Sequence, residues 1–184
     1  MSEPMVILGI DPGTNFMGYG VVEVVDKKPR CITMGWIDLS KYDDPYTKLR
    51  QIFERVGGLI DSYKPDQVAF ESPFFGENVQ SMLKLGRAQG VAMAAALTKG
   101  LPVSEYAPRK VKISVTGNGN ATKEQVAAML KSILKFDTLP PKLDATDGLA
   151  VAMCHYYDSL SLKTTKSGQG WADFIRQNPD RVKK

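Results

Sequence analysis

Two short apolar runs of the chain each end in an acidic residue, and this pattern constrains the fold more than any other feature. Asp11 follows the run Met5–Ile10, and Glu71 follows the run Gln67–Phe70. A proline stands within two residues after each carboxylate. Because proline disfavours helix before it and removes a ladder donor, each run should be a β-strand that stops at its carboxylate.

Two further carboxylates, Asp144 and Asp147, stand at the start of a stretch with helical periodicity. The apolar residues on one face of that helix are Leu149, Ala150, Met153 and Tyr157. Residues three apart on a helix are surface neighbours, so Asp144 and Asp147 can reach one site. With Asp11 and Glu71 they could surround a pair of divalent metal ions, an arrangement used to cleave phosphodiesters. These four residues are the candidate catalytic residues and metal ligands.

Each of these acidic residues also has an ordinary structural explanation. Asp144 and Asp147 could be an N-cap and a first-turn residue favoured by the helix dipole. Asp11 with the following Pro-Gly is, taken alone, simply a turn, and a glutamate at a strand end is usually a solvated carboxylate. The metal-site interpretation therefore depends on taking all four residues together.

Length and composition fit one enzyme domain. The chain has 184 residues, of which 43% are hydrophobic, enough for a sizeable core. We expect a nuclease domain over residues 1–158 and a flexible tail over residues 159–184. Cys31 and Cys154 show no CxxC spacing, which argues against a disulfide framework or a zinc site. With no apolar stretch of about 20 residues and no signal peptide, a soluble, cytoplasmic protein is expected.

Basic residues are concentrated in the middle of the chain. Residues 1–83 carry eight basic and twelve acidic side chains, whereas residues 84–135 carry nine basic and two acidic. A basic surface attracts the phosphate backbone, so the middle segment is the expected footprint for nucleic acid. A solvated helix surface could also be basic. The acidic site favours DNA, because bound metal ions would let the scissile phosphate approach it.

Hydrophobic periodicity predicts an α/β layer with a mixed five-stranded sheet flanked by helices. The expected strands are 5–10, 18–26, 30–38, 67–71 and 101–105. The expected helices are 49–60, 78–99, 126–134 and one that opens at Asp144. A turn at Lys27–Pro29 should join the second and third strands as a hairpin, and Thr122 with Gln125 resembles a capping box. The small residues of helix 78–99 permit close packing, either at a dimer interface or within one subunit.

In the order and spacing of these residues the chain resembles the RuvC-type Holliday-junction resolvases of the ribonuclease H-like superfamily. The matching segments are ILGIDPGTNFMGYGVV at 7–22, VAFESPFFGENVQSMLKLGRAQGVA at 68–92, EYAPRKVKISVTGNGNATKEQV at 105–126 and LDATDGLAVAMCH at 143–155. The resemblance implies a ribonuclease H-like fold. It also implies an endonuclease that makes paired symmetric nicks in four-way DNA junctions, by Mg²⁺-dependent hydrolysis, in homologous recombination and DNA repair.

The resemblance further implies cofactors and partners. Asp11, Glu71, Asp144 and Asp147 match the family's acidic tetrad, with Asp11 as the candidate bridging ligand. Two Mg²⁺ ions per active site are expected, with Mn²⁺ able to substitute; one would activate water and the other would stabilise the leaving 3′-oxygen. A homodimer suits the near two-fold symmetry of the junction. A junction-binding protein and a branch-migration motor are the expected further partners.

Candidate DNA contacts follow from the same resemblance. Phe74 matches a family position near the branch point, where an aromatic side chain could stack on an unpaired base. Its neighbour Phe75 could stack likewise or be buried. Lys112 and Lys123 match basic positions that support catalysis or phosphate binding. His155 lies about 16 Å along the helix from Asp144, so we expect a core or partner-facing residue, although some resolvases of this family use a catalytic histidine.

Other functions have to be weighed against a resolvase. An ATPase or kinase of the actin and sugar-kinase type also places Asp, Gly and Thr after a strand, but it needs two such domains and a longer chain. A catalytically silent junction-binding module would be expected to lack a carboxylate, and all four are present. A ribonuclease H-type enzyme is the nearest rival and would prefer an RNA:DNA hybrid over branched DNA.

Overall fold

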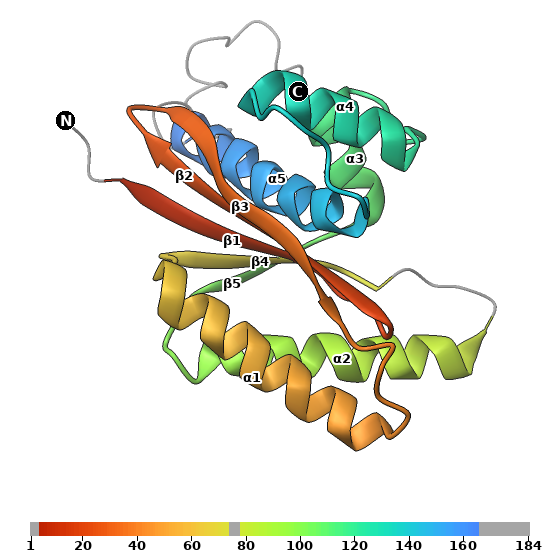
Figure 1. The fold of residues 1–184 in the computed structure, drawn as a ribbon. Helices are drawn as coiled ribbons and strands as arrows, with labels where there is room; N and C mark the ends of the chain where they lie inside the picture. The colour runs from red at the N-terminus through yellow and green to blue at the C-terminus, as the bar shows by residue number, and fades with distance from the viewer. Residues whose placement is uncertain (1–3, 74–77, 166–184) are drawn as a thin grey trace, which may run out of the picture.

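A five-stranded sheet separates two layers of helices in the computed structural model, which describes residues 4–73 and 78–165 (Figure 1). The strands are β1 (Met5–Asp11), β2 (Phe16–Val25), β3 (Lys28–Asp38), β4 (Gln67–Glu71) and β5 (Val103–Tyr106). The helices are α1 (Pro45–Tyr63), α2 (Val79–Leu97), α3 (Pro108–Thr116), α4 (Lys123–Leu134) and α5 (Asp144–Thr165). Helices α3, α4 and α5 lie on one side of the sheet, and α1 and α2 lie on the other (Figure 1).

The sheet is mixed, as predicted. Its strand order is β3-β2-β1-β4-β5. β1, β2 and β3 pair antiparallel, whereas β1, β4 and β5 pair parallel. β1 therefore lies at the centre, with the hairpin strands on one side and the parallel strands on the other. The expected α/β class and five-stranded sheet are confirmed.

The β2–β3 hairpin turns at Asp26 and Lys27, so the predicted turn at Lys27–Pro29 was wrong by about one residue. Both turn residues have positive φ angles, 49° and 62°. Two consecutive positive φ angles are what a type I′ hairpin turn requires. Pro29 lies in β3, opposite Val24. A proline is tolerated there because β3 is an edge strand, whose outer side needs no ladder donor.

Side-chain caps fix where the helices begin. The Asp44 carboxylate accepts a hydrogen bond of 2.6 Å from the Thr47 amide at the start of α1. The predicted capping box of α4 is present: the Thr122 amide donates to Gln125 Oε1 at 2.9 Å, and the Gln125 amide donates to the Thr122 hydroxyl at 3.3 Å. Both caps satisfy amides that have no partner inside the helix.

Periodicity did not predict α3. This nine-residue helix buries only Val111 and Val115, too few apolar positions to mark a helix face. Its ends do carry signals, because Pro108 occupies the first turn and Gly117 follows the last residue with a φ of 75°. Proline at the start and glycine just after the end are a common helix signature.

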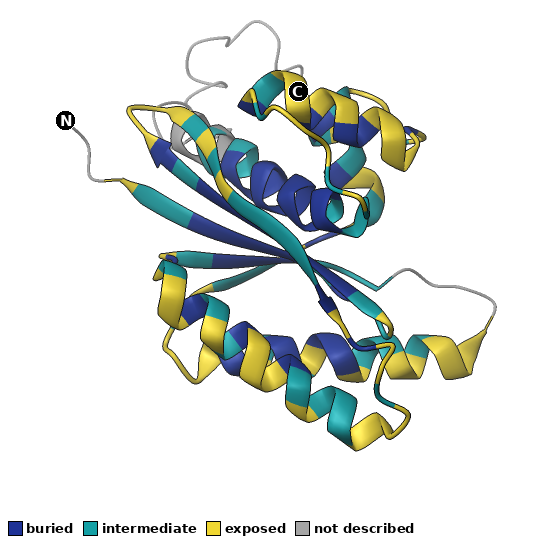
Figure 2. Ribbon diagram, in the orientation of Figure 1, coloured by how far each residue is buried: buried dark blue, intermediate teal, exposed yellow. Residues whose placement is uncertain are grey.

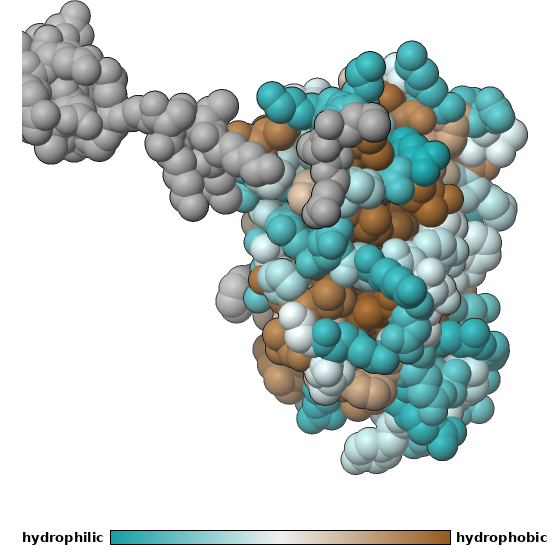
Figure 3. Space-filling view, turned by 90° about the vertical axis from the view of Figure 1, so that its left-hand side faces the viewer, coloured by the Kyte–Doolittle hydropathy of each residue, from teal (hydrophilic) through white to brown (hydrophobic). Residues whose placement is uncertain are grey.

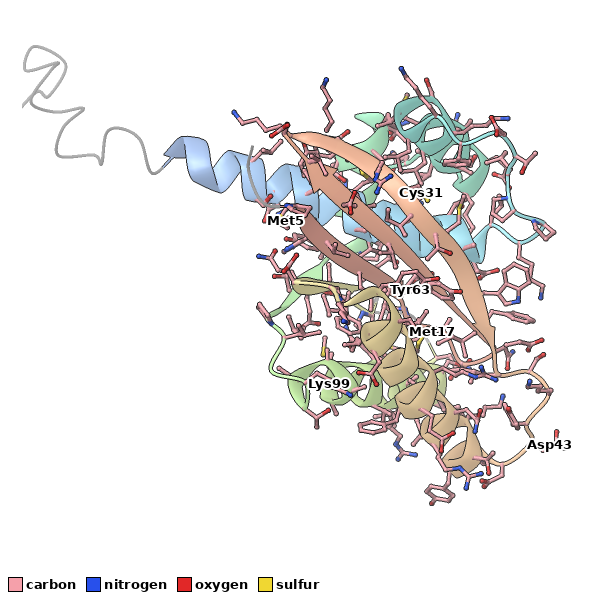
Figure 4. The ribbon with its side chains drawn as sticks, turned by 60° about the vertical axis from the view of Figure 1, so that its left-hand side comes forward. Met5, Met17, Cys31, Asp43, Tyr63 and Lys99 are labelled. Carbon is pink, nitrogen blue, oxygen red and sulfur yellow. The ribbon has the colours of Figure 1, made fainter. Side chains whose placement is uncertain are left out.

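The hydrophobic core has two parts, one on each face of the sheet. Met17 and Tyr63 belong to the part between α1 and the sheet, where Figure 4 labels them. α5 is buried along most of its described length, because it is enclosed between the sheet and the α3–α4 pair (Figure 2).

Hydrophilic and hydrophobic side chains alternate on the face that Figure 3 shows. On the side where β1 begins, apolar atoms gather in separate patches between hydrophilic side chains (Figure 3). Among the described residues, none of the helices is both long and apolar enough to cross a membrane.

Candidate active site

Asp11 and Glu71 end adjacent parallel strands. Ile10 of β1 lies opposite Phe70 of β4, so the two carboxylates occupy the next position in the same register. Side chains alternate along a strand. Gly9 contacts α5, and two residues later Asp11 points to the same face. Both carboxylates therefore stand on the α5 side of the sheet, at strand ends that the prolines predicted.

Glycine lets the start of α5 approach this edge closely. A Cβ atom on Gly18, which lies opposite Asp11, would come within 1.8 Å of the Asp144 carbonyl oxygen. A Cβ on Gly148 would come within 2.4 Å of the Tyr19 Cα atom. The main chain of α5 thus rests directly on the main chain of β2. This contact brings the first turn of the helix, with Asp144 and Asp147, beside the two strand ends.

The four carboxylates interact electrostatically. Burial, followed by the charges of Glu71 and Asp147, raises the pKa of Asp11 well above its usual value; Asp144 adds to this effect. Burial, followed by the charge of Asp147, raises the pKa of Glu71 to about 7. Burial also raises the pKa of Asp147, although a hydrogen bond from Lys123 offsets part of that increase. Like charges in a poorly solvated site oppose one another's ionisation, so this cluster favours cations.

The two predicted lysines lie at this cluster. Lys123, the first residue of α4, places its ammonium 2.5 Å from Asp147 Oδ2 and 3.9 Å from Asp144 Oδ1. Burial alone would lower the pKa of Lys123, but the hydrogen bond to Asp147 raises it. Lys112 of α3 is near enough to lower the pKa of Glu71. The structure therefore brings together six of the seven predicted site residues, and Phe74 lies outside the described residues.

The donor set suits a hard divalent cation. Carboxylate oxygens are the ligands that Mg²⁺ prefers. Burial, and then the neighbouring carboxylates, raise the pKa values of Asp11 and Glu71, so a bound cation would favour their ionised forms. Within residues 4–73 and 78–165, no three His, Cys, Asp or Glu side chains already form a metal-binding group. Lys123 is instead inserted between Asp144 and Asp147 and supplies part of the required positive charge.

His155 is a core residue, one of the two positions predicted for it. It is 7% exposed, and its Nδ1 atom is 2.7 Å from the Tyr106 hydroxyl. Its Nε2 atom contacts the Gln67 side chain. Burial lowers the pKa of His155. Both ring nitrogens are engaged away from the carboxylate cluster, which agrees with the predicted exclusion of His155 from the metal site.

Sequence reasoning missed Gln89, which supports the Glu71 strand end. This buried side chain of α2 donates hydrogen bonds of 3.2 Å to the Glu71 carbonyl and 3.0 Å to the Glu105 carboxylate. It bridges the ends of β4 and β5. A single glutamine on a helix face otherwise made of alanines was the available signal, because a buried polar side chain needs partners.

A hollow of about 550 Å³ lies elsewhere, between β3 and α1. Its lining includes Tyr19, Tyr42 and Tyr63, and none of the predicted site residues. This hollow is therefore separate from the carboxylate cluster. The cluster at the strand ends is the better candidate site because burial and neighbouring charges raise the pKa values of Asp11, Glu71 and Asp147, and because its residues suit one chemistry.

Comparisons with known proteins show the family of this chain. A sequence model of the family described as crossover junction endodeoxyribonuclease RuvC matches residues 7–155. The RuvC protein of Christiangramia forsetii is 58% identical over 183 residues, covering 100% of this chain and 95% of its own. That of Bacteroides fragilis is 58% identical over 180 residues, covering 97% and 96%.

Solved structures lead to the same family. The structure of Thermus thermophilus RuvC in complex with a Holliday junction substrate is 33% identical to this chain, with a TM-score of 0.78. The similarity covers 85% of this chain and 96% of that one. It confirms the expected ribonuclease H-like fold. The matched sequence, the shared fold and the carboxylate cluster together place this chain in the RuvC family of crossover junction endodeoxyribonucleases.

Proposed function

We propose that this protein resolves four-way DNA junctions by making paired symmetric nicks, in homologous recombination and DNA repair. Asp11, Glu71, Asp144 and Asp147 form the active site. The observation that carries the proposal is their mutual electrostatic coupling at the ends of two strands and the start of one helix. The related Thermus thermophilus protein is bound to a Holliday junction substrate, which supports the same DNA substrate here.

The family's nucleases are metal-dependent, and the proposed ion is Mg²⁺, two per active site, with Mn²⁺ able to substitute. When bound, such ions lower the pKa of the attacking water and stabilise the leaving oxygen. Asp11 is the proposed bridging ligand, because it is electrostatically coupled to all three other carboxylates. Glu71, Asp144 and Asp147 complete the ligand set.

The positive charges of Lys112 and Lys123 offset part of the negative charge of the carboxylates and are proposed to attract the phosphates of the DNA. Lys112 lowers the pKa of Glu71 and of Asp147, so its charge is felt across the cluster. Lys123 bonds Asp147 directly. In the complex these ammonium groups hold the phosphate backbone beside the carboxylates. Phe74 is proposed to stack on a base at the branch point.

We propose that the working form is a homodimer formed through α2. α2 has a buried face and an outer face. The buried face, packed within the subunit, is made of alanines: Ala88, Ala92, Ala95 and Ala96. Val79, Leu83 and Leu97 are 65%, 52% and 60% exposed. A Cβ atom on Gly86 or Gly90 would meet nothing within 4 Å, so the outer face of α2 leaves room for a second backbone.

The first turns of α2 are largely exposed and extend beyond the rest of their layer (Figure 2). An exposed apolar stripe on a helix is a common protein interface, and a two-fold dimer suits the symmetry of the junction. The outer stripe of α2 is therefore the proposed contact between two copies.

A junction-binding protein and a branch-migration motor are the proposed partners of the enzyme, and the cytoplasm is its proposed compartment. Cys31 and Cys154 are free thiols, which suits a reducing compartment. Residues 1–158 are the proposed nuclease domain, although α5 itself continues to Thr165. The proposed tail, residues 159–184, falls mostly outside the described residues.

The test is cleavage of end-labelled four-way junction, matched duplex and RNA:DNA hybrid with Mg²⁺, comparing the unmodified protein with Asp11→Asn. Paired nicks at symmetric positions in the junction alone, lost in Asp11→Asn while junction binding persists, are expected. Cleavage of the hybrid would indicate a ribonuclease H instead. Junction binding without cleavage would indicate a recognition module, and normal turnover by Asp11→Asn would remove Asp11 from the mechanism.

A further inference from the structure

Lys142 is held by aromatic rings at the rim of the active site. Its Nζ atom lies 3.1 Å from the centroid of the Phe16 ring and 6.0 Å from that of Trp36. Ammonium groups are attracted to the faces of aromatic rings. Phe16 begins β2, Trp36 lies in β3 and Lys142 precedes α5, so distant parts of the sequence build this one position.

The register of the sheet gives the main-chain separation between Trp36, beside this lysine, and the Asp11 strand end. Trp36 lies opposite Gly18, and Gly18 lies opposite Asp11. Trp36 and Asp11 are thus two strands apart, about 10 Å at the usual strand spacing. In addition, Lys142 precedes Asp144 by only two residues. The lysine therefore flanks the carboxylate edge on the β3 side.

The charge of Lys142 is held in place without a direct ion pair among the described residues. Lys99, Lys110 and Lys123 each contact a carboxylate within 4 Å, whereas Lys142 does not. Hydrogen bonds from the hydroxyl and amide of Ser40, at 2.6 and 3.0 Å, lower the pKa of the nearby Asp38, and the charge of Lys142 lowers it further. An aromatic partner fixes an ammonium group, and with no carboxylate in contact its N–H donors stay open to an anion.

We propose that Lys142 binds a backbone phosphate of the junction strand that passes from the carboxylates toward β3. The separation of Trp36 from Asp11, about 10 Å, corresponds to about three nucleotides at 3.4 Å of rise per nucleotide. Phe16 and Trp36 position the ammonium group for this contact. The inference rests on the proposed function, since it needs the scissile strand to lie at the carboxylate cluster.

The experiment measures junction binding as a function of salt concentration, in an Asp11→Asn background that leaves the DNA uncut. Each phosphate contact adds about 0.9 to the slope of log K against log salt. Lys142→Met should weaken binding about three- to tenfold and reduce the slope by about 0.9. Lys142→Arg should restore the slope because it keeps the charge. Phe16→Leu should weaken binding but keep the slope, since the lysine remains charged.

The matched control is Lys99→Met, which removes a lysine beside α2, on the side of the sheet opposite α5 (Figure 4). Its slope should equal that of the parent. An unchanged slope in Lys142→Met would overturn the proposal. Lys142 would then have only a structural role, in packing the segment before α5 against the sheet. Failure of the parent itself to bind the junction would instead refute the proposed function. Melting temperatures verify that each variant is folded.

Discussion

Lys123 donates a hydrogen bond of 2.5 Å to Asp147, and this contact ties the first turn of α4 to the first turn of α5. It places one positive charge inside a cluster of four carboxylates. Without metal, Lys123 therefore offsets repulsion that would otherwise oppose folding. Its replacement should affect stability only where the carboxylates are ionised.

Lys123→Met should lower the free energy of unfolding of the metal-free protein by about 1–3 kcal/mol at pH 8. At pH 5 the loss should be smaller, because Glu71, whose pKa burial and the charge of Asp147 raise to about 7, is protonated there and carries no charge for Lys123 to offset. Urea unfolding at both pH values measures this. In Lys99→Met, which breaks an exposed ion pair with Asp61, the loss should stay below about 1 kcal/mol. Equal losses at both pH values in Lys123→Met would contradict the argument.

Glu71 makes the metal-free protein less stable as pH rises. Burial, then the charge of Asp147, raises its pKa from 4.5 to about 7. The folded state therefore binds the proton more tightly than the unfolded state, so stability falls between these pH values and the full penalty is present above pH 7. Glu71→Gln should raise the free energy of unfolding by about 1–3 kcal/mol at pH 8, and by less at pH 5.

Urea unfolding without divalent ions checks this prediction. Glu124→Gln is the control, because hydrogen bonds lower the pKa of Glu124 and its removal should not stabilise the protein at pH 8. Mg²⁺ binding should also release protons near pH 7, which calorimetry in buffers of different ionisation enthalpy detects. A Glu71→Gln variant that is less stable than the parent at pH 8 would refute the assigned pKa shift.

Gly18→Ala should damage both stability and the metal site. Its new Cβ atom would collide with the Asp144 carbonyl oxygen, at 1.8 Å, so the start of α5 must move. We expect a loss of about 2–4 kcal/mol, as for overpacked or strained positions, and weaker Mg²⁺ binding by calorimetry. Gly58→Ala on α1 is the control: its Cβ atom meets nothing within 4 Å, and it should stabilise the protein by about 0.5–1 kcal/mol. Unchanged Mg²⁺ affinity in a folded Gly18→Ala variant would disprove the coupling.

Leu83→Glu should convert the proposed dimer to a monomer. Leu83 is 52% exposed on the outer face of α2, so the change adds a charge to the proposed contact without disturbing the core. Light scattering measures the molar mass. Met129→Glu is the control on α4, where the side chain is 40% exposed. A dimer that survives Leu83→Glu places the contact elsewhere, and a monomeric parent removes the dimer from the proposal.

Local signals predicted the parts of the fold that depend on neighbouring residues. The prolines after Asp11 and Glu71 marked the strand ends, and Thr122 with Gln125 marked the start of α4. The hairpin turn was misplaced because Pro29 looks like a turn residue, whereas the position of β3 at the sheet edge, which tolerates it, is a tertiary property.

Contacts between distant residues could not be predicted in this way. Gln89 reaches the Glu71 carbonyl across 18 residues of sequence, and nothing near Lys142 indicates that Phe16 will lie beneath its ammonium group. α3 escaped detection because a helix with two buried side chains leaves almost no periodic pattern. The grouping of the four carboxylates was predictable only because each stood at the end of a recognisable element.

The contact of α5 with β1 and β2 limits which substitutions the sequence can accept. Main-chain atoms at Gly9, Gly18 and Gly148 determine how close the helix lies to the sheet. Substitutions among neighbouring core residues such as Leu149 can therefore alter stability while the spacing of the carboxylates is preserved. A change in a core side chain near this contact costs stability, whereas a side chain added at a contact glycine also displaces the helix that carries Asp144 and Asp147.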